Sequence, residues 1–168
     1  MTALVTGVAG FLGSSLAEVL VDQGQDILGI DCFLEYYPRE VKTRNLQSLR
    51  KSGRFHLIEA PLQEVDLKPL VSRAEVVFHL AAQAGVRASW GRDFSIYTNN
   101  NILATQRLLE AAVGQKLQAF VYASSSSVYG DGVTLPTRED VRLRPVSPYG
   151  VTKLAAEMLC HSYFVNHG

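Results

Sequence analysis

The sequence predicts an α/β domain of three layers, in which a doubly wound parallel sheet carries helices on both faces. Two observations lead to this prediction. Five short apolar runs of strand character alternate with helical patterns along the 168 residues, and such alternation produces parallel strands joined by right-handed crossovers. The first run is also followed by Gly7, Gly10 and Gly13, which is the strand–turn–helix layout of a dinucleotide-binding unit.

The glycine stretch begins after the first predicted strand, residues 3–5. Gly7 allows a sharp turn, Gly10 allows the backbone to approach a pyrophosphate, and Gly13 lets the next helix pack tightly on the sheet. The first N–H groups of that helix and its positive dipole end favour phosphate. The glycine spacing by itself also fits a tight strand–helix turn without a ligand. A P-loop is excluded because Ser14, and not a lysine, follows Gly13.

A second strand, residues 27–30, ends at Asp31. This acid has the spacing of about 20 residues expected for the carboxylate that binds an adenosine ribose. A carboxylate there accepts hydrogen bonds from the ribose and repels a 2′-phosphate. The sequence therefore predicts NAD as the cofactor in preference to NADP.

The later elements follow in the order that the fold class requires. Ser147 as N-cap and Pro148 at the first helical position predict the start of the last helix. His79, in the fourth strand, is interpreted as a core or strand-end histidine. Strands are predicted at residues 55–58, 76–80 and 119–122, and helices around 16–20 and at 39–51, 93–113 and 148–166, with a short helix or helical turn near 63–72.

Composition excludes several classes of protein. Hydrophobic residues make up 47% of the chain and its formal net charge is zero, which predicts a globular domain and not a disordered segment. The absence of a basic stripe or a long apolar run predicts no nucleic-acid partner and no membrane span. Cys32 and Cys160 lack metal-ligand spacing, so we expect free thiols and no metal site. Without a signal-peptide pattern, a cytoplasmic location is expected.

A second group of residues is suited to chemistry. Tyr149 and Lys153 are spaced i, i+4 and share one face of the last predicted helix, where an ammonium group favours the phenolate form of a tyrosine. Ser125 follows the fifth strand, where its hydroxyl can hold a sugar hydroxyl and pass a proton to Tyr149. Ser126 is the alternative for that role. The Tyr/Lys spacing by itself also fits a surface pair. Ala81 and Ala82, after the fourth strand, are small enough for close approach of a ligand.

These motifs together resemble the extended short-chain dehydrogenase/reductases, and within them the NAD-dependent epimerase/dehydratase family of nucleotide-sugar enzymes. The resemblance covers essentially the whole chain. Its marks are Thr6-Gly7-x-x-Gly10-x-x-Gly13, Asp31, His79-Leu80-Ala81-Ala82, Asn101-Ile102-x-x-Thr105, Ser124-Ser125-Ser126-Ser127-Val128-Tyr129-Gly130 and Ser147-Pro148-Tyr149-x-x-x-Lys153.

The resemblance implies a Rossmann fold, with residues 1–168 as the NAD-binding domain of a longer epimerase. It implies that Tyr149 is the catalytic base, that Lys153 binds the nicotinamide ribose and tunes Tyr149, and that Ser125 orients the sugar. Asn101 is implied to be a buried support of the active site. The implied cofactor contacts are Gly7, Gly10, Phe11, Leu12, Gly13, Asp31, Leu62, Leu80, Ala81, Ala82, Tyr149 and Lys153.

The same resemblance points to a reaction. Sugar 4,6-dehydratases of the family carry an Asp-Glu pair where this chain has Ser126-Ser127, which favours 4-epimerisation through a 4-keto intermediate. Residues 83–87 and Tyr36-Tyr37 look similar to UDP-glucose and UDP-glucuronate 4-epimerases, so a UDP-sugar substrate is implied. Pro61-Leu62 departs from the family, which has an acid before the aliphatic residue to hold the adenine amino group; a backbone group is the alternative for that contact.

Length and assembly give further expectations. No sixth strand follows the last predicted helix, and the substrate-binding C-terminal domain of the family is missing, so little or no turnover is expected of the 168 residues alone. The alternatives are an NAD-binding module without turnover and another extended reductase or dehydratase acting on a related sugar nucleotide. The resemblance also implies a homodimer through the helices near 93–113 and 148–166, with Leu103 and Leu159 in the interface.

Overall fold

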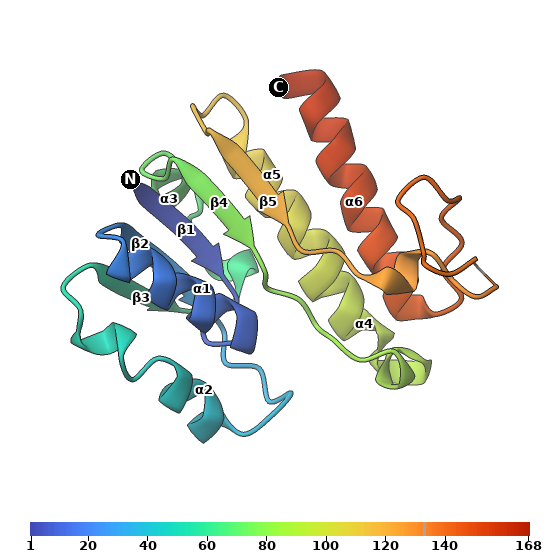
Figure 1. The fold of residues 1–168 in the computed structure, drawn as a ribbon, viewed down its shortest axis with the longest axis horizontal. Coiled ribbons are helices and arrows are strands. Elements are labelled where there is room, and N and C mark those ends of the chain that lie inside the picture. Colours follow the sequence, from blue (N-terminus) through green and yellow to red (C-terminus); the bar gives the residue numbers. More distant parts are fainter. Residues whose placement is uncertain (133) are drawn as a thin grey trace. The chain divides into compact units, whose positions relative to one another are not determined.

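The computed structural model describes residues 1–132 and 134–168, and Figure 1 shows their fold. The chain divides into two compact units. One contains Met1–Ala81 and Arg107–Ala123, and the other contains Ala82–Gln106 and Ser124–Gly168. The first unit holds the sheet, and the second holds the long C-terminal helix.

The first unit is built on a five-stranded parallel sheet with the strand order β3-β2-β1-β4-β5. This result confirms the predicted parallel α/β architecture. Because the order reverses between β1 and β4, the carboxyl ends of these two strands mark the topological switch point, where such sheets bind ligands. The strands are β1 (Thr2–Thr6), β2 (Asp26–Asp31), β3 (Phe55–Glu59), β4 (Val76–His79) and β5 (Ala119–Tyr122).

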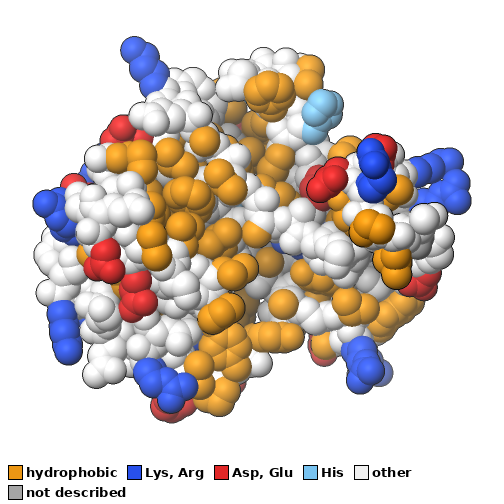
Figure 2. Space-filling model, in the orientation of Figure 1, with side chains coloured by type: hydrophobic (Ala, Val, Ile, Leu, Met, Phe, Trp, Pro, Cys, Tyr) orange, Lys and Arg blue, Asp and Glu red, His pale blue; other side chains and the backbone are white. Residues whose placement is uncertain are grey.

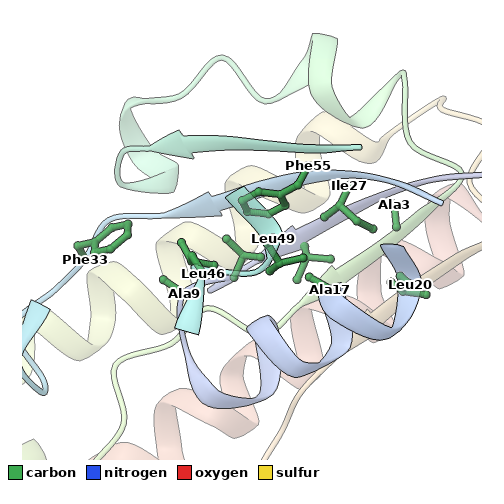
Figure 3. Close-up of a cluster of buried hydrophobic side chains, with 11 residues drawn as sticks. Ala3, Ala9, Ala17, Leu20, Ile27, Phe33, Leu46, Leu49 and Phe55 are labelled. Carbon is green, nitrogen blue, oxygen red and sulfur yellow. The ribbon is translucent and has the colours of Figure 1, made fainter. Parts of the chain in front are cut away.

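Both faces of the central strand are covered, as the doubly wound prediction requires. Ala3 and Val5 point to one face of β1 and Leu4 points to the other, yet all three are fully buried. Helix α1 (Phe11–Asp22) packs on β1 and β2. Figure 3 shows the apolar cluster on this side, where the sheet residues meet Ala17 and Leu20 of α1.

One predicted helix of the first unit is shorter than expected. The pattern at 39–51 forms α2 (Arg39–Asn45) and a 3₁₀ turn, η1 (Leu49–Lys51). The short helix or helical turn predicted near 63–72 is found as a 3₁₀ turn, η2 (Leu62–Glu64), and a short helix, α3 (Lys68–Val71). Pro69 has no N–H group to continue an earlier helix and so lies at the start of α3.

The second unit is organised around α6 (Pro148–His167), which packs on α4 (Phe94–Tyr97), on η5 (Thr98–Leu103) and on the 3₁₀ turn η6 (Ser126–Val128). The helix predicted at 93–113 is wound as α4, η5 and α5 (Ala104–Ala112), and η5 is a π-helix. Two 3₁₀ turns, η3 (Arg87–Ser89) and η4 (Gly91–Asp93), come before α4.

Charged side chains of both signs are interspersed over the face drawn in Figure 2. Cys32 and Cys160 are free and partly buried. Within residues 1–132 and 134–168, no three or more His, Cys, Asp or Glu side chains form a group that could hold a metal ion. In the same residues, no helix is both long and apolar enough to cross a membrane.

The close packing at the start of α1 makes Gly13 sensitive to substitution. A Cβ at this position would lie 2.2 Å from the carbonyl oxygen of Gly7 and 2.8 Å from Cα of Val8. Both are backbone atoms, so we expect Gly13→Ala to lower the free energy of unfolding by about 1–3 kcal/mol. Urea unfolding of the protein that carries this chain measures the change.

Gly53 provides the matched control, because a Cβ there meets no atom within 4 Å. Gly53→Ala is expected to change the free energy of unfolding by less than about 0.5 kcal/mol. Equal stability of the two variants would contradict the close packing of α1 on the turn.

Candidate functional site

The turn after β1 is shaped by close backbone contacts. Gly7 has a φ of +70°, and a Cβ on it would lie 2.8 Å from the backbone nitrogen of Ala81. Its N–H group donates to the carbonyl oxygen of Ile30 at 2.8 Å, which fixes the turn to β2. Glycine is therefore required here both for conformation and for space.

Helix α1 leaves this turn with an open N-terminus. Gly10 is its N-cap and makes no side-chain capping bond. The first two helical residues, Phe11 and Leu12, are 78% and 63% exposed. Because the first N–H groups of a helix have no carbonyl partner within the helix, they can donate to an anion such as a pyrophosphate. The predicted contacts of Gly10, Phe11, Leu12 and Gly13 are compatible with this geometry and stay predictions.

Asp31 is buried beside the same turn. Its Oδ2 accepts a hydrogen bond from the N–H group of Ala9 at 3.0 Å. Its Oδ1 accepts from the N–H group of Phe33 at 2.7 Å and from Nζ of Lys42 at 3.1 Å. The predicted ribose-binding acid therefore lies beside the predicted phosphate turn, but it is already paired with a buried cation that sequence reasoning missed.

Aromatic rings surround that cation. The Lys42 Nζ lies 5.7 Å from the ring centre of Phe33 and 5.5 Å from that of Tyr37. Burial, together with the negative charge of Asp31, raises the pKa of the Tyr37 phenol above its usual value of 10.0. Asn45, also on α2, donates to the carbonyl oxygen of Ala9 at 3.0 Å. Helix α2 thus supports both the turn and the acid.

The residues after β4 are held by a buried polar contact. The Thr6 hydroxyl lies 2.7 Å from Nδ1 of His79 and accepts a hydrogen bond from the N–H group of Ala81 at 3.2 Å. His79 is fully buried, which confirms its interpretation as a core residue. Thr6 also accepts, through its carbonyl oxygen, from Leu80 at 3.3 Å. Leu80 and Ala81 therefore have fixed positions next to Gly7.

Two predicted cofactor residues have different surroundings. Leu62 lies in η2 after Pro61 and is only 5% exposed, so its side chain is largely covered. Ala82 is exposed and belongs to the second unit. Their contacts with a cofactor stay predictions, as does the replacement of the family's acid by a backbone group at this position.

In the second unit, the start of α6 is fixed around Tyr149. Ser147 is the N-cap, as predicted, and its hydroxyl accepts from the N–H group of Gly150 at 3.1 Å. The N–H group of Tyr149 donates to the buried Ser89 hydroxyl at 3.0 Å. The Tyr149 ring packs edge-on against buried Tyr97, with ring centres 6.3 Å apart. The phenol thus projects from a rigid helix start.

Asn101 joins the π-helix to that helix start. Its amide oxygen accepts from the N–H group of Gln83 at 2.7 Å, and its Nδ2 donates to the Gln83 carbonyl at 3.1 Å and to the Thr152 hydroxyl at 3.0 Å. Thr152 in turn donates to the Tyr149 carbonyl at 2.8 Å. Asn101 is buried, as predicted, and its support of an active site stays a prediction. Thr152 was not identified from the sequence.

Lys153 follows Tyr149 by one helical turn and is only 2% exposed. Burial lowers the pKa of its ammonium group from 10.5 to about 8, while the negative charge of Glu157 partly opposes this shift. The group is therefore still mainly protonated at neutral pH. A cation on the same helix face as a phenol can stabilise the phenolate.

Ser125 and Ser126 are distinguished by their surroundings. Ser125 is the N-cap of η6, is partly buried, and its hydroxyl oxygen accepts from the N–H group of Ser127 at 3.2 Å. This bond uses an oxygen lone pair and not the hydroxyl hydrogen, which can still be donated. Ser126 is exposed. The role of Ser125 in orienting a sugar, with Ser126 as the alternative, stays a prediction.

The residues that the sequence missed carry little local signal. Lys42 is one of several basic residues on α2, and Ser89 belongs to no recognised motif. Thr152 lies directly between the predicted catalytic residues, which is the one hint that the spacing offered. The first unit brings together the glycine turn, Asp31 and Ala81, and the second brings together Asn101, Tyr149 and the start of α6.

Comparisons with known proteins give consistent matches. A sequence model of the NAD dependent epimerase/dehydratase family matches residues 3–168. An uncharacterized UDP-glucose epimerase of Bacillus subtilis, YtcB, is 47% identical over 169 residues, which is 100% of this chain and 53% of the relative. The UDP-glucuronate 4-epimerase of Thermodesulfobacterium geofontis is 37% identical over 169 residues, 98% of this chain and 52% of the relative.

A solved structure is similarly close. The crystal structure of UDP-glucuronic acid 4-epimerase from Bacillus cereus, in complex with UDP-glucuronic acid and NAD, has a TM-score of 0.96 and 47% identity. The match covers 99% of this chain and 53% of that one. The chain thus spans about half the length of the curated relatives it matches.

The buried state of Lys153 can be tested by titration. In the protein that carries this chain, without cofactor, we expect its Nζ or Cε nuclear magnetic resonance signal to titrate at a pKa of about 8. Lys153→Met assigns the signal. Glu157→Gln removes the charge that raises this pKa and is expected to move the midpoint lower. A midpoint at the usual value of 10.5 would contradict the burial of the amine.

Proposed function

Since the chain belongs to the NAD-dependent epimerase/dehydratase family, we propose that it supplies the cofactor-binding residues and the catalytic residues of a 4-epimerase of UDP-sugars. The predicted family and Rossmann fold are confirmed by the matches above. One observation in this chain supports the proposal most directly. Tyr149 and Lys153 lie one turn apart on α6, and Lys153 is a buried cation, a group that can stabilise a phenolate beside it.

The residues of the first unit fit NAD. The turn at Gly7 leaves no room for a Cβ, and the open N-terminus of α1 provides N–H groups for the pyrophosphate. Asp31 is fixed by backbone N–H groups and can accept from a ribose hydroxyl. Bound NAD supplies the hydride acceptor and donor for chemistry at C4 of the sugar.

The roles of the second unit follow from its polar groups. Tyr149 takes the proton of the 4-hydroxyl as C4 is oxidised, and the Lys153 ammonium stabilises the phenolate that accepts it. Ser125 donates its hydroxyl hydrogen to the sugar oxygen. The 4-keto sugar turns over and is reduced on its other face, and Tyr149 returns the proton to the oxygen.

The chain favours epimerisation over dehydration for a chemical reason. Loss of water from a 4-keto sugar requires an acid and a base next to the reacting carbons. Ser126 and Ser127 occupy the positions where family dehydratases carry acids, and a serine hydroxyl is a weak substitute for either role. The UDP-sugar substrate class is supported by the relatives named above.

Substitution of Tyr149 tests the proposed reaction. Tyr149→Phe removes the proton acceptor, so we expect a loss of about 10²–10⁴-fold in kcat, with NAD binding retained. The assay adds UDP-glucose, UDP-galactose and UDP-glucuronate separately to the protein with NAD and measures the 4-epimers by chromatography.

Tyr163→Phe is the matched control, because Tyr163 lies on the same helix and its hydroxyl accepts from Gln106 at 3.1 Å. It is expected to keep most of the activity. Unchanged turnover by Tyr149→Phe would contradict the proposed base. The low turnover expected of residues 1–168 alone stays a prediction that the same assay tests.

We also propose a homodimer through the second unit. Large apolar side chains are exposed on its helices, with Leu103 at 41% and Met158 at 50%, whereas Leu159 is partly buried. We expect sedimentation velocity to show a dimer that dissociates on dilution, and Met158→Glu to weaken it because it places a charge in the interface.

Val19→Glu is the control for that measurement, since Val19 is 53% exposed on α1 of the first unit. It is expected to leave the dimer unchanged. Sedimentation as a monomer at high micromolar concentration would count against the proposed interface.

A further inference from the structure

The most unusual feature of the cofactor-binding residues is the buried ion pair between Asp31 and Lys42. Their side chains are 5% and 9% exposed, and Nζ of Lys42 lies 3.1 Å from Oδ1 of Asp31. An acid that only bound a ribose would need no cation partner. A buried lysine is costly unless it is paired, so the presence of Lys42 calls for an explanation.

The hydrogen bonds of Asp31 limit what else it can bind. A carboxylate offers about four acceptor positions on its two oxygens. Oδ1 accepts from Phe33 and Lys42, and Oδ2 accepts from Ala9. Only Oδ2 therefore retains an acceptor position, so a ribose hydroxyl would be held through that oxygen, while Lys42 pairs with Oδ1 of the same carboxylate.

Lys42 is also held in place from its other side. The rings of Phe33 and Tyr37 lie 5.7 and 5.5 Å from its Nζ, where a cation is attracted to the ring faces. Phe33 adopts a φ of +51°, and this conformation accompanies the bond from its N–H group to Asp31. The ammonium position is therefore set by neighbours other than Asp31 as well.

We propose that Lys42 is a specificity-determining residue, a cation able to bind the 2′-phosphate of NADP. The carboxylate of Asp31 neutralises this cation, and the site therefore prefers NAD. With Asp31 charged, a phosphate meets a carboxylate beside it and a lysine already paired. Without that charge, the buried ammonium lacks its counter-ion, and a phosphate dianion is the ligand that replaces it. The preference for NAD over NADP thus depends on the balance between the Asp31 carboxylate and the Lys42 ammonium.

Arg39 is a second cation near Phe33, and its geometry predicts a smaller contribution to NADP binding. Its guanidinium lies 4.5 Å from the ring centre of Phe33 and pairs with Glu59, and its side chain is 53% exposed. An exposed pair is screened by solvent. Arg39 does not contact Asp31, so it serves as a matched control for a general effect of positive charge.

The test measures binding of NAD and NADP by calorimetry to the protein that carries this chain, without substrate. Asp31→Asn keeps the shape of the side chain and removes its charge. We expect it to tighten NADP at least about tenfold, a change that corresponds to about 1.4 kcal/mol. In the double variant Asp31→Asn with Lys42→Met, that gain is expected to be lost, whereas Asp31→Asn with Arg39→Met keeps most of it.

Two results would overturn the proposal. One is that Asp31→Asn binds NADP no better than the parent protein. The other is that the double variant with Lys42→Met binds NADP as tightly as Asp31→Asn. Because the double variant removes both charges, it leaves neither buried charge without its counter-ion.

Lys42→Met alone provides an independent measurement should Asp31→Asn fail to fold. It is expected to weaken NADP more than NAD and so to increase the preference for NAD. Equal weakening of both cofactors would show that Lys42 only supports Asp31. None of these measurements depends on epimerase turnover, so they separate this proposal from the proposed reaction.

Discussion

The burial of the Asp31 carboxylate is the constraint on which the first unit depends. A buried carboxylate must be satisfied, and here its partners come from the glycine turn, from the loop after β2 and from α2. Satisfying one side chain therefore fixes the end of β2, the glycine turn and a helix relative to one another. The same bonds fix the orientation of the carboxylate that we propose for the cofactor ribose, so in that proposal the stability of the turn and the recognition of the cofactor have one physical origin.

In the second unit, the buried polar side chain that joins separate segments is a neutral one, Asn101. The Asn101 amide is almost fully buried and bonds to both polar groups of the Gln83 backbone and to Thr152. These bonds connect the segment after β4 to the π-helix and to α6. Because Thr152 lies between Tyr149 and Lys153, the network holds the helix turn that presents both. The network uses only neutral groups, and the cation on this helix turn, Lys153, has a pKa that burial lowers to about 8.

The sequence was informative wherever a feature depends on neighbours along the chain. The five strands follow from apolar runs, and the turn follows from the glycine spacing. Ser147 was identified as an N-cap because capping is local. The i, i+4 spacing placed Tyr149 and Lys153 on one helix face. Helix lengths were less well predicted, since the polar helical pattern at 39–51 continues past the end of α2 into a separate 3₁₀ turn.

The sequence by itself thus determined the fold class, the glycine turn, the position of Asp31 after β2 and the spacing of the Tyr/Lys pair, because each is a pattern within one or two elements. Only the tertiary structure decided how these groups are supported. Lys42 reaches Asp31 from a separate helix, Ser89 bonds to Tyr149 from 60 residues away, and the π-helix forms around Asn101. These contacts join distant segments, and the burial that gives them their strength exists only once the chain has folded.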